Sequence, residues 1–479
     1  MKTVNLVQKV ALLCAILFIF ACNDVNFDQV LVPEITAMPG DVTQVSLKLA
    51  TEVAEVFFHK QTDSSTLKST TVALKKDASV ETIKDDDNNP LFYIINYPDR
   101  GFIIVSATRD YYPILAYSEE NSFKPTPEMN GVLGWMEETK DAIRTSNTLD
   151  NETKASMRAL WSNYETLDQS SDTGSKLKSS DPRMEAFQAH IEQLNYQYGY
   201  SGWVFTSLQS ADLPYSEYNK VRDNCYHYGS PEEYTIVGVK SSYSNRRVEP
   251  LLATKWNQNS PYNSLCPSGR AAGCAAVAVA QILKYYKYPS LSLNGYNLNW
   301  NNMPNTGVGS PIYTSTPALM VHVGNAMGMH YWSAGSWALP GDVVNALRNI
   351  YSYTVRRANH SNSEVRGEIL QQRPVLMLGF PSLNPLGGHY WVCDGVHSIQ
   401  SSAVYFAEYQ TYFMGNYIYD SMPGNPWPGN PGYVYDTEQL LYYMNWGWGG
   451  NHDGWYLCTN VNSGNGNFQW QRENFFINK

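Results

Sequence analysis

A run of apolar residues between Gly269 and Pro289 constrains this chain more than any other feature of its sequence. In GRAAGCAAVAVAQILKYYKYP no Gly or Pro interrupts residues 274–288, and almost no polar residue occurs before Gln281. Small and large apolar side chains occupy nearly every face, which predicts a helix buried on all sides and ended by Pro289. The rest of the chain must therefore supply a core wide enough to enclose a whole helix.

Cys274 lies at the predicted start of this helix, directly after Gly273. Unpaired backbone N–H groups and the positive end of the helix dipole favour a negative charge there, so the position can lower the pKa of a thiol and make it a nucleophile. A lone cysteine is, however, more often a small buried hydrophobe. The choice between the two depends on the rest of the chain.

The composition is typical of a large exported protein. The 479 residues are enough for two or three domains, charged residues make up only 16%, and there are 35 Tyr and 13 Trp. The formal net charge is -10, so no broad basic surface is available for nucleic acid or anionic lipid. Nucleic acid is therefore not an expected partner.

Residues 1–22 have the pattern of an export signal. Lys2 and Lys9 precede the apolar run 10–20, and Cys22 follows a small residue. The pattern resembles a bacterial lipoprotein signal, in which Cys22 becomes the lipidated first residue and anchors the protein to the cell envelope or surface. An ordinary cleaved signal peptide is the alternative. No other segment approaches the ~20 apolar residues that span a bilayer.

The cysteine count predicts at least one free thiol. Two of the seven cysteines, Cys14 and Cys22, belong to the signal region, and five remain: Cys225, Cys266, Cys274, Cys393 and Cys458. An odd number in an exported protein requires a free thiol or an intermolecular bond. A reactive Cys274 would be that free thiol, and the pairing of the others stays open.

The segments before residue 246 form a tether, a small mixed domain and an extension. Residues 23–44 have the composition of a tether, and DQSSDTGSKLKSSDPR at 168–183 that of a protease-accessible linker. Local patterns predict a helix over 45–60, strands at 91–96 and 101–106, helical segments within 131–167, a helix near 184–196 and a strand at 233–239.

His389 is the strongest candidate for a base. It follows Gly387 and Gly388, which leave room for a substrate backbone, and it opens the strand-like HYWVCDGV. Alternation along a strand puts His389, Trp391 and Cys393 on one face. Histidine changes its charge near neutral pH and can take the proton of a thiol, although a structural histidine is the alternative.

The stretch YYMNWGWGGNHDGWYL predicts a strand that ends at Asn445, an aromatic and glycine-rich loop, and a second strand from about Gly454. An Asn side chain can accept the ring N–H of a histidine and hold its tautomer, while the indoles of Trp446 and Trp448 exclude water. The alternative is an ordinary hairpin with packed tryptophans.

Cys274, His389 and Asn445 occur in the order in which papain-type peptidases arrange their catalytic groups, and the sequence resembles the streptopain-like cysteine peptidases. These are secreted or lipid-anchored bacterial enzymes made as zymogens. The motifs that carry the resemblance are WNQNSPYNSLCP (256–267), GCAAVAVAQILKYYKYP (273–289), WSAGS (332–336), GGHYWVCDG (387–395) and MNWGWGG (444–450), with the propeptide-like RGFIIVSATRDYYPILAYSEENSF at 100–123.

The resemblance implies an α+β fold. A papain-like catalytic domain at 246–479, with a central buried helix packed on an antiparallel sheet or barrel, would follow a small α+β propeptide domain at 45–167; residues 168–245 would be a linker and an uncertain extension. No cofactor and no metal are implied.

The resemblance also assigns roles to individual residues. Cys274 would be the nucleophile and His389 the general base and then acid, with Asn445, Trp446 and Trp448 beside the ring. Gln258 is the candidate side-chain donor to the oxyanion, and Ser333 and Gly388 match positions that contact substrate.

The implied function is hydrolysis of protein or peptide substrates through a thioester acyl-enzyme, with the propeptide as an intramolecular inhibitor. Activation cleavage is expected within 168–182 or near Asn245, Arg246 and Arg247.

The sequence leaves two other classes of function open. A metal site could use His389, Cys393, Asp394 and His397. A strand, however, separates His389 and Cys393 by about 13 Å at ~3.3 Å per residue, too far for one ion. A catalytically inactive peptidase-like adhesin or binding lipoprotein is the remaining alternative, against which the intact Cys274 and His389 argue.

Overall fold

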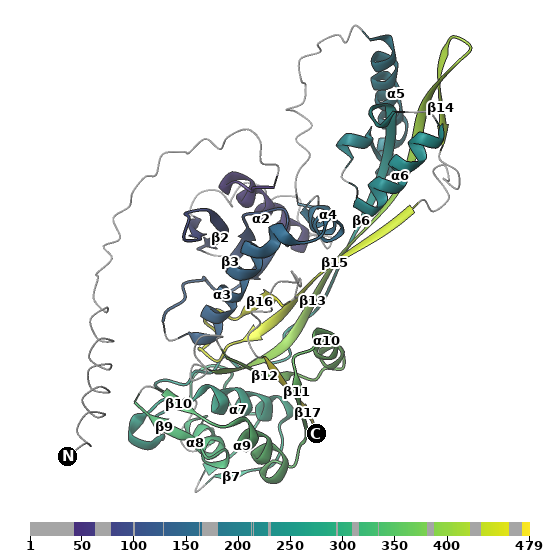
Figure 1. The fold of residues 1–479 in the computed structure, drawn as a ribbon. Helices are drawn as coiled ribbons and strands as arrows, with labels where there is room; N and C mark the ends of the chain where they lie inside the picture. The colour runs from purple at the N-terminus through teal and green to yellow at the C-terminus, as the bar shows by residue number, and fades with distance from the viewer. Residues whose placement is uncertain are drawn as a thin grey trace, which may run out of the picture. The chain divides into compact units, whose positions relative to one another are not determined.

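The computed structural model describes the chain from Thr43 onward, with several gaps (Figure 1). The expected signal peptide, the tether up to residue 42 and most of the expected linker lie outside the described residues. None of the helices it describes is both long and apolar enough to cross a bilayer. The described residues are 43–62, 78–98, 101–127, 129–161, 163–164, 181–211, 213, 215–228, 231–293, 296–308, 316–333, 335–380, 388–421, 433–458 and 472–479.

The N-terminal part is an antiparallel meander covered by helices on both faces. Its elements are α2 (Leu47–Thr62), β1 (Ser79–Lys84), β2 (Pro90–Tyr97), β3 (Gly101–Ser106), β4 (Ile114–Ser118), α3 (Asn130–Thr145) and α4 (Asn151–Trp161). β3 is buried along its whole length because Ile103 packs with Phe57 of α2, whereas Phe102 packs in the cluster that contains Trp135 of α3. The strands expected at 91–96 and 101–106 are confirmed.

The meander continues directly into the main sheet. β4 pairs with β16 (Gly454–Leu457), where Tyr117 lies opposite Trp455 and Ala116 opposite Tyr456. The strand order is β1-β2-β3-β4-β16-β15-β13-β12-β17-β11. The remaining strands of this order are β11 (Thr354–Asn359), β12 (Val375–Gly379), β13 (His389–Phe413), β15 (Tyr433–Asn445) and β17 (Glu473–Asn478).

The predicted buried helix is α7 (Cys274–Tyr286), and residues 275–283 are buried on all sides. It ends two residues earlier than Pro289 predicts because Lys287 adopts a left-handed C-cap with φ 49°. α7 lies below the sheet in Figure 1 and packs there with the helices and hairpins on the same face of the sheet. These are β7 (Ser292–Leu293), β8 (Tyr296–Asn297), α8 (Thr316–Ala326), β9 (His330–Trp332), β10 (Gly335–Trp337) and α9 (Pro340–Asn345). α10 (Asn362–Leu370) packs on the other face of the sheet, because Val365 and Ile369 belong to the cluster that contains Trp135 of α3.

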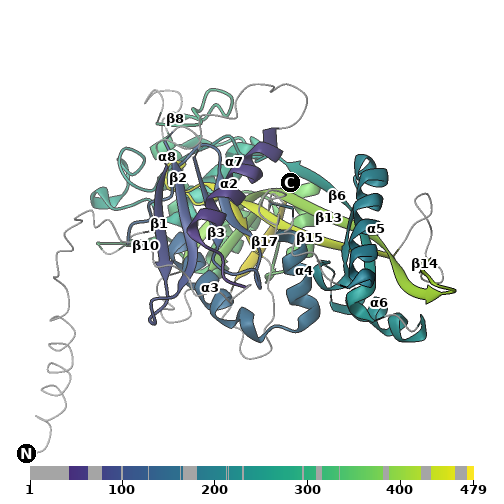
Figure 2. The ribbon, with the colours of Figure 1, turned by 90° about the horizontal axis from the view of Figure 1, so that it is seen from above.

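The segment expected as an extension is folded. Its elements are α5 (Pro182–Tyr198), β5 (Val204–Ser207), α6 (Tyr215–Tyr228) and β6 (Thr235–Val248), and they join the far end of β13 together with β14 (Asn416–Ser421). β6 pairs with β13 from Thr235 to Val248, and both helices lie beside this ribbon (Figures 1 and 2). The strand expected at 233–239 is therefore the beginning of a longer one. The short turns are η1 (Ser146–Thr148), η2 (Gly199–Ser201), η3 (Leu208–Ser210), η4 (Glu232–Tyr234), η5 (Pro267–Gly269) and the π-helical η6 (Ala346–Ile350).

Tyr117 fastens the N-terminal part to the main sheet. The side chain is fully buried, its hydroxyl bonds to Nδ1 of His397 at 2.8 Å, and its ring stacks on Trp455 with centroids 6.1 Å apart. An unpaired buried polar atom costs about 1–3 kcal/mol, so this one hydroxyl matters to stability.

Tyr117→Phe should lower the free energy of unfolding by about 1–3 kcal/mol, because Nδ1 of His397 loses its partner. Urea denaturation of the purified chain measures it. Tyr412→Phe is the matched control, since this ring is 64% exposed and its loss of a hydroxyl should change stability by less than about 0.5 kcal/mol. Equal effects of the two variants would contradict the assigned role of Tyr117.

Candidate active site

The thiol of Cys274 lies at the N-terminus of α7, as the sequence predicts. Gly273 precedes it with φ 91°, and a Cβ atom there would lie 3.0 Å from Sδ of Met329, so both conformation and space call for glycine. The backbone N–H of Tyr390 donates to Sγ at 3.4 Å. Cys274 is partly buried, and all five described cysteines are free thiols, of which the other four are fully buried.

His389 opens β13 and is held by a backbone carbonyl. Its Nε2–H donates to the carbonyl oxygen of Trp446 at 2.9 Å, which leaves the lone pair of the neutral ring on Nδ1. The indole of Trp448 lies parallel to the ring at 5.8 Å between centroids, and that of Trp391 at 6.2 Å. The ring is therefore fixed in orientation and enclosed by indoles.

In this state the site favours two neutral groups. Burial raises the pKa of the Cys274 thiol, and the backbone N–H groups of Tyr390 and Ala275 only partly oppose it. Burial also lowers the pKa of His389 to about 4, against the opposing effect of the Trp446 carbonyl. Within the described chain no hydrogen bond joins the thiol to the imidazole. The two groups meet through Tyr390, which follows His389 and contacts Sγ.

The N-terminal part covers the histidine directly. Gly131, the second residue of α3, lies so close that a Cβ atom on it would be 2.6 Å from Cδ2 of His389 and 2.8 Å from Cε3 of Trp446. Nothing in the sequence marks Gly131 as functional, because a glycine near a helix start is common. Only the packing of distant segments reveals it.

The expected bond between Asn445 and His389 is not formed. Asn445 lies opposite Val392 in the β13–β15 pairing, and Val392 packs in the cluster around α7, so the amide faces that helix. Its Oδ1 accepts from Nε2 of Gln281 at 3.0 Å, and its Nδ2 donates to the carbonyl of Thr254 at 2.8 Å. The next residue, Trp446, supplies the oxygen that holds the ring.

Gln281 is the polar residue that interrupts the apolar run. Its Oε1 accepts the backbone N–H of Trp256 at 3.3 Å, so one buried amide ties α7 to the two loops that flank the site. A polar side chain within an otherwise buried helix is the sequence signal from which this role could have been inferred.

Gln258 lies between the two halves of the site. Its carbonyl accepts the N–H of Ala272 at 2.8 Å, two residues before Cys274, and the preceding Asn257 pairs with Trp448. The side chain is 9% exposed and makes no hydrogen bond to the described residues. This placement agrees with the predicted oxyanion role, which remains a prediction.

The two expected substrate positions are placed differently. Ser333 is an exposed turn residue between β9 and β10, a hairpin tied to the segment before Cys274 because Ser336 donates to the carbonyl of Ala271 at 2.6 Å. The space beside Gly388 is filled by the ring of Phe380, which a Cβ atom would approach to 2.7 Å. Packing therefore explains this glycine without a substrate.

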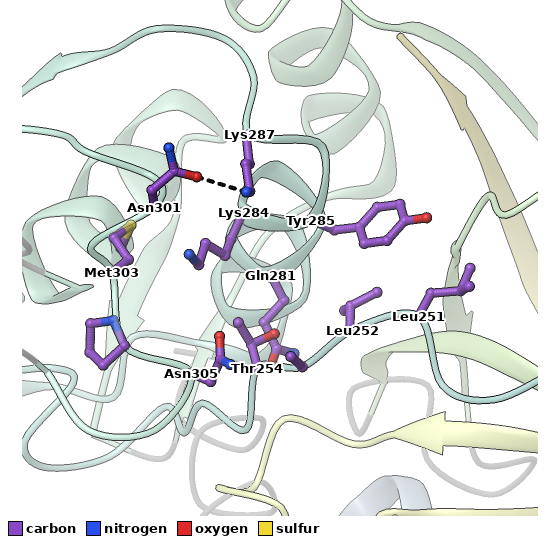
Figure 3. A pocket seen from close by; sticks show the side chains of 12 residues that line it. Leu251, Leu252, Thr254, Gln281, Lys284, Tyr285, Lys287, Asn301, Met303 and Asn305 are labelled. Atoms are coloured by element: carbon purple, nitrogen blue, oxygen red, sulfur yellow. Dashed lines mark hydrogen bonds between the residues drawn. The ribbon is translucent and has the colours of Figure 1, made fainter.

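A separate cavity of about 480 Å³ lies beside α7 (Figure 3). Gln281, Lys284 and Lys287 face it from the helix, and Thr254 and Asn305 from the facing segments, whereas neither Cys274 nor His389 lines it. Lys287 donates to Oδ1 of Asn301 at 2.7 Å. In the described parts of the chain no group of three or more His, Cys, Asp or Glu side chains is arranged to hold a metal ion.

Comparisons with known proteins match both parts of the chain. Residues 256–456 match the Peptidase C10 family and residues 42–143 match the Spi protease inhibitor family. Streptopain of Streptococcus pyogenes serotype M28 (strain MGAS6180) is 26% identical over 268 residues, which cover 45% of this chain and 56% of streptopain. Thiol protease/hemagglutinin PrtT of Porphyromonas gingivalis is 24% identical over 252 residues, 45% of this chain and 24% of PrtT. The chain thus spans about half the length of the streptopain it matches.

Two solved structures from Prevotella intermedia are also similar. The prointerpain A fragment is 18% identical, with a TM-score of 0.43 over 83% of this chain and 98% of the fragment. Active interpain A cysteine protease is 23% identical, with a TM-score of 0.31 over 48% of this chain and 94% of that one.

An α+β fold in which an inhibitor-type domain packs on a histidine at a strand start, while a cysteine at a helix start contacts the next residue of that strand, is typical of papain-like cysteine peptidases with a propeptide. Within that class the family matches are specific. Residues 256–456 are similar to the Peptidase C10 family, to which the relationship with streptopain also points, and residues 42–143 are similar to the Spi protease inhibitor family.

Gly131→Ala should loosen the cover on His389, because the added methyl group overlaps the imidazole and the Trp446 indole. Overpacking costs about 1–3 kcal/mol, so alkylation of Cys274 by iodoacetamide in the full chain should become about tenfold faster. Gly367→Ala, in α10 with open space around the glycine, is the control and should leave the rate unchanged. A rate in Gly131→Ala no faster than in the control would contradict the contact.

Proposed function

We propose that the protein is an exported cysteine endopeptidase made as a zymogen, which hydrolyses peptide bonds through Cys274 and His389. The observation that carries the proposal is the bond from Nε2–H of His389 to the Trp446 carbonyl, because it leaves Nδ1 as the proton acceptor. Tyr390, the next residue, contacts the thiol of Cys274 at the N-terminus of α7. The match of residues 256–456 to the Peptidase C10 family supports it.

The proposed chemistry is acyl transfer. Nδ1 of His389 takes the proton of Cys274, and the thiolate attacks the peptide carbonyl. The backbone N–H of Cys274 and the side chain of Gln258 stabilise the oxyanion, the imidazolium protonates the leaving amine, and water then releases the acyl-enzyme. Loss of one oxyanion donor typically costs about 3 kcal/mol in barrier.

The covered form is the latent one in this proposal. Burial disfavours both the thiolate and the imidazolium, and α3 occupies the space beside the ring. Departure of the propeptide rehydrates both groups, after which the dipole of α7 favours the thiolate. The same contacts make the propeptide an intramolecular inhibitor.

Two proposed activation sites differ in accessibility. Asn245, Arg246 and Arg247 belong to β6 and pair with β13, so a protease can reach them only after that strand has separated. The alternative, within 168–182, lies almost entirely outside the described residues.

Export and anchoring through Cys22 complete the proposal, and both concern residues that the structure does not describe. Membrane fractionation of cells that express the Cys22→Ala variant tests the anchor. Continued recovery of the variant in the membrane fraction would exclude lipid attachment at Cys22.

Mass spectrometry before and after incubation, with Cys274→Ala as the control, tests the proposed activity. The wild-type chain should process itself, hydrolyse casein and take up one thiol probe at Cys274, whereas Cys274→Ala should do none of these. His389→Ala should lower turnover by several orders of magnitude while the fold is retained. Self-processing of Cys274→Ala at the wild-type rate would show that the nucleophile is wrong. A labelled but inactive wild type would favour a binding module.

Mild acid should favour release of the propeptide. Burial lowers the pKa of His389 to about 4 and that of His397 to about 3, whereas an exposed histidine titrates near 6.5. At these two histidines the open state therefore binds more protons, so their contribution to the stability of the covered state is lost as the pH falls through 6.5. Asp453, whose pKa burial raises to about 7, opposes this effect in part, because departure of the propeptide favours its ionised form. From pH 7 to 5.5 the loss is about 1 kcal/mol for each histidine that becomes exposed.

Hydrogen exchange of α3 in the Cys274→Ala chain, corrected for intrinsic rates, measures this effect. Protection of α3 should fall at pH 5.5 relative to pH 7, while protection of α10 serves as the internal reference. Equal protection of α3 at the two pH values would contradict the assignment.

A further inference from the structure

Asp453 is a buried carboxylate that the proposed chemistry does not use. It lies at the end of the loop between β15 and β16 and is 1% exposed. Its Oδ1 accepts the backbone N–H of Trp446 at 2.9 Å. Its Oδ2 is buried and has no partner among the residues that the structure describes. A buried carboxylate is costly, so its presence calls for an explanation.

Trp446 joins this carboxylate to the histidine. Its N–H donates to Asp453, and its carbonyl accepts Nε2–H of His389 at 2.9 Å. The position of that carbonyl therefore depends on what holds the Trp446 backbone. The Nε2–H bond fixes the tautomer of His389. The position of the Trp446 carbonyl therefore decides whether Nδ1 is free to act as a base.

The loop that contains these residues is conformationally demanding. Gly447, Gly449 and Gly450 have φ values of 76°, 72° and 89°, and His452, which is not a glycine, has φ 64°. Such a backbone needs an anchor, because these four of the eight loop residues lie outside the regions that L-residues prefer. Asp453 holds this loop together by two hydrogen bonds. Its N–H donates to the Gly450 carbonyl, and its Oδ1 accepts the N–H of Trp446 at the start of the loop.

We infer that Asp453 is a positioning residue, whose carboxylate fixes the Trp446 carbonyl and through it the orientation and tautomer of His389. The inference rests on the proposed function and deepens it.

The charged surroundings of Asp453 change when the propeptide leaves. Burial raises the pKa of Asp453 to about 7, the Trp446 N–H and Lys255 oppose this, and Glu120 reinforces it. Asp394, fully buried on β13, is a second carboxyl group nearby, and burial together with Asp453 raises its pKa. Glu120 belongs to the propeptide and is paired with Lys255. Its departure removes a repulsion and frees Lys255, so both changes favour the ionised carboxylate.

The test compares Asp453→Leu, which removes the acceptor but keeps a side chain branched at Cγ, with Asp453→Asn, whose amide oxygen can still accept the Trp446 N–H. Asp223→Asn, an exposed aspartate on α6, is the control. Each variant is processed by immobilised wild-type enzyme, its active sites are titrated with a thiol probe, and kcat and KM are measured per titrated site.

We expect Asp453→Leu to lose about 10²-fold in kcat per titrated site with KM within about twofold, since misplacement of a catalytic group by about 1 Å has such an effect. Asp453→Asn should recover most of the loss, and Asp223→Asn should match the wild type. A merely structural role would instead lower the number of titrated sites and leave kcat per site unchanged.

An unchanged kcat per titrated site in Asp453→Leu would overturn this inference but not the proposed function. If that variant does not fold, Asp453→Asn decides: full titration with kcat within about tenfold of wild type supports the inference, and full titration with a loss above about 10²-fold overturns it. A wild type that neither labels nor hydrolyses would overturn the proposed function, and this inference with it.

Discussion

A helix without a polar face has to be enclosed, and the enclosure of α7 governs the rest of the structure. Its buried amide, Gln281, would cost about 1–3 kcal/mol if it were left unpaired. Gln281 finds its partners in the backbone of Trp256 and the side chain of Asn445, and from these two residues the loops on either side of the site begin. Burial of one helix and placement of the loops around Cys274 and His389 are therefore the same packing problem.

The second determinant is that the propeptide and the main body share one sheet. β4 pairs with β16, and β16 leads out of the loop that holds Trp446 and Asp453. The inhibitor-type domain therefore does more than cover His389. It is bonded to the sheet beside the loop that orients the histidine, and Asn121 and Lys124 touch that loop through the carbonyl of Asp453 and Nε2 of His452.

Much of the framework could be predicted from the sequence because it follows from local periodicity. The start of α7 at Cys274, the start of β13 at His389 and the end of β15 at Asn445 each follow from short patterns. The direction of the Asn445 side chain could not be predicted from a short pattern, because it depends on the register of β15 against β13. The segment from α5 to β6 shows the same limit of prediction. Local patterns indicate α5 and the first part of β6, but no local pattern indicates that β6 pairs with β13.

The contacts that distinguish the covered site were beyond prediction for a related reason. Gly131 against His389 and Asp453 against Trp446 are close approaches between segments whose own patterns are ordinary. Only the assembled core shows that a methyl group in one place would collide with the imidazole, or that one carboxylate oxygen meets a particular N–H. The role of such residues depends on which side chains they contact in the folded protein, so it cannot be predicted from their amino-acid type.

The shared sheet has a consequence for the mature molecule. In the proposed activation β4 departs, and β16 becomes a terminal strand whose outward N–H and C=O groups at Trp455 and Tyr456 lose their bonding partners. A bare strand of this kind is a template for any extended polypeptide. In this proposal maturation therefore exposes a sheet edge to which an extended polypeptide can bind, a few residues along the backbone from the loop that holds His389.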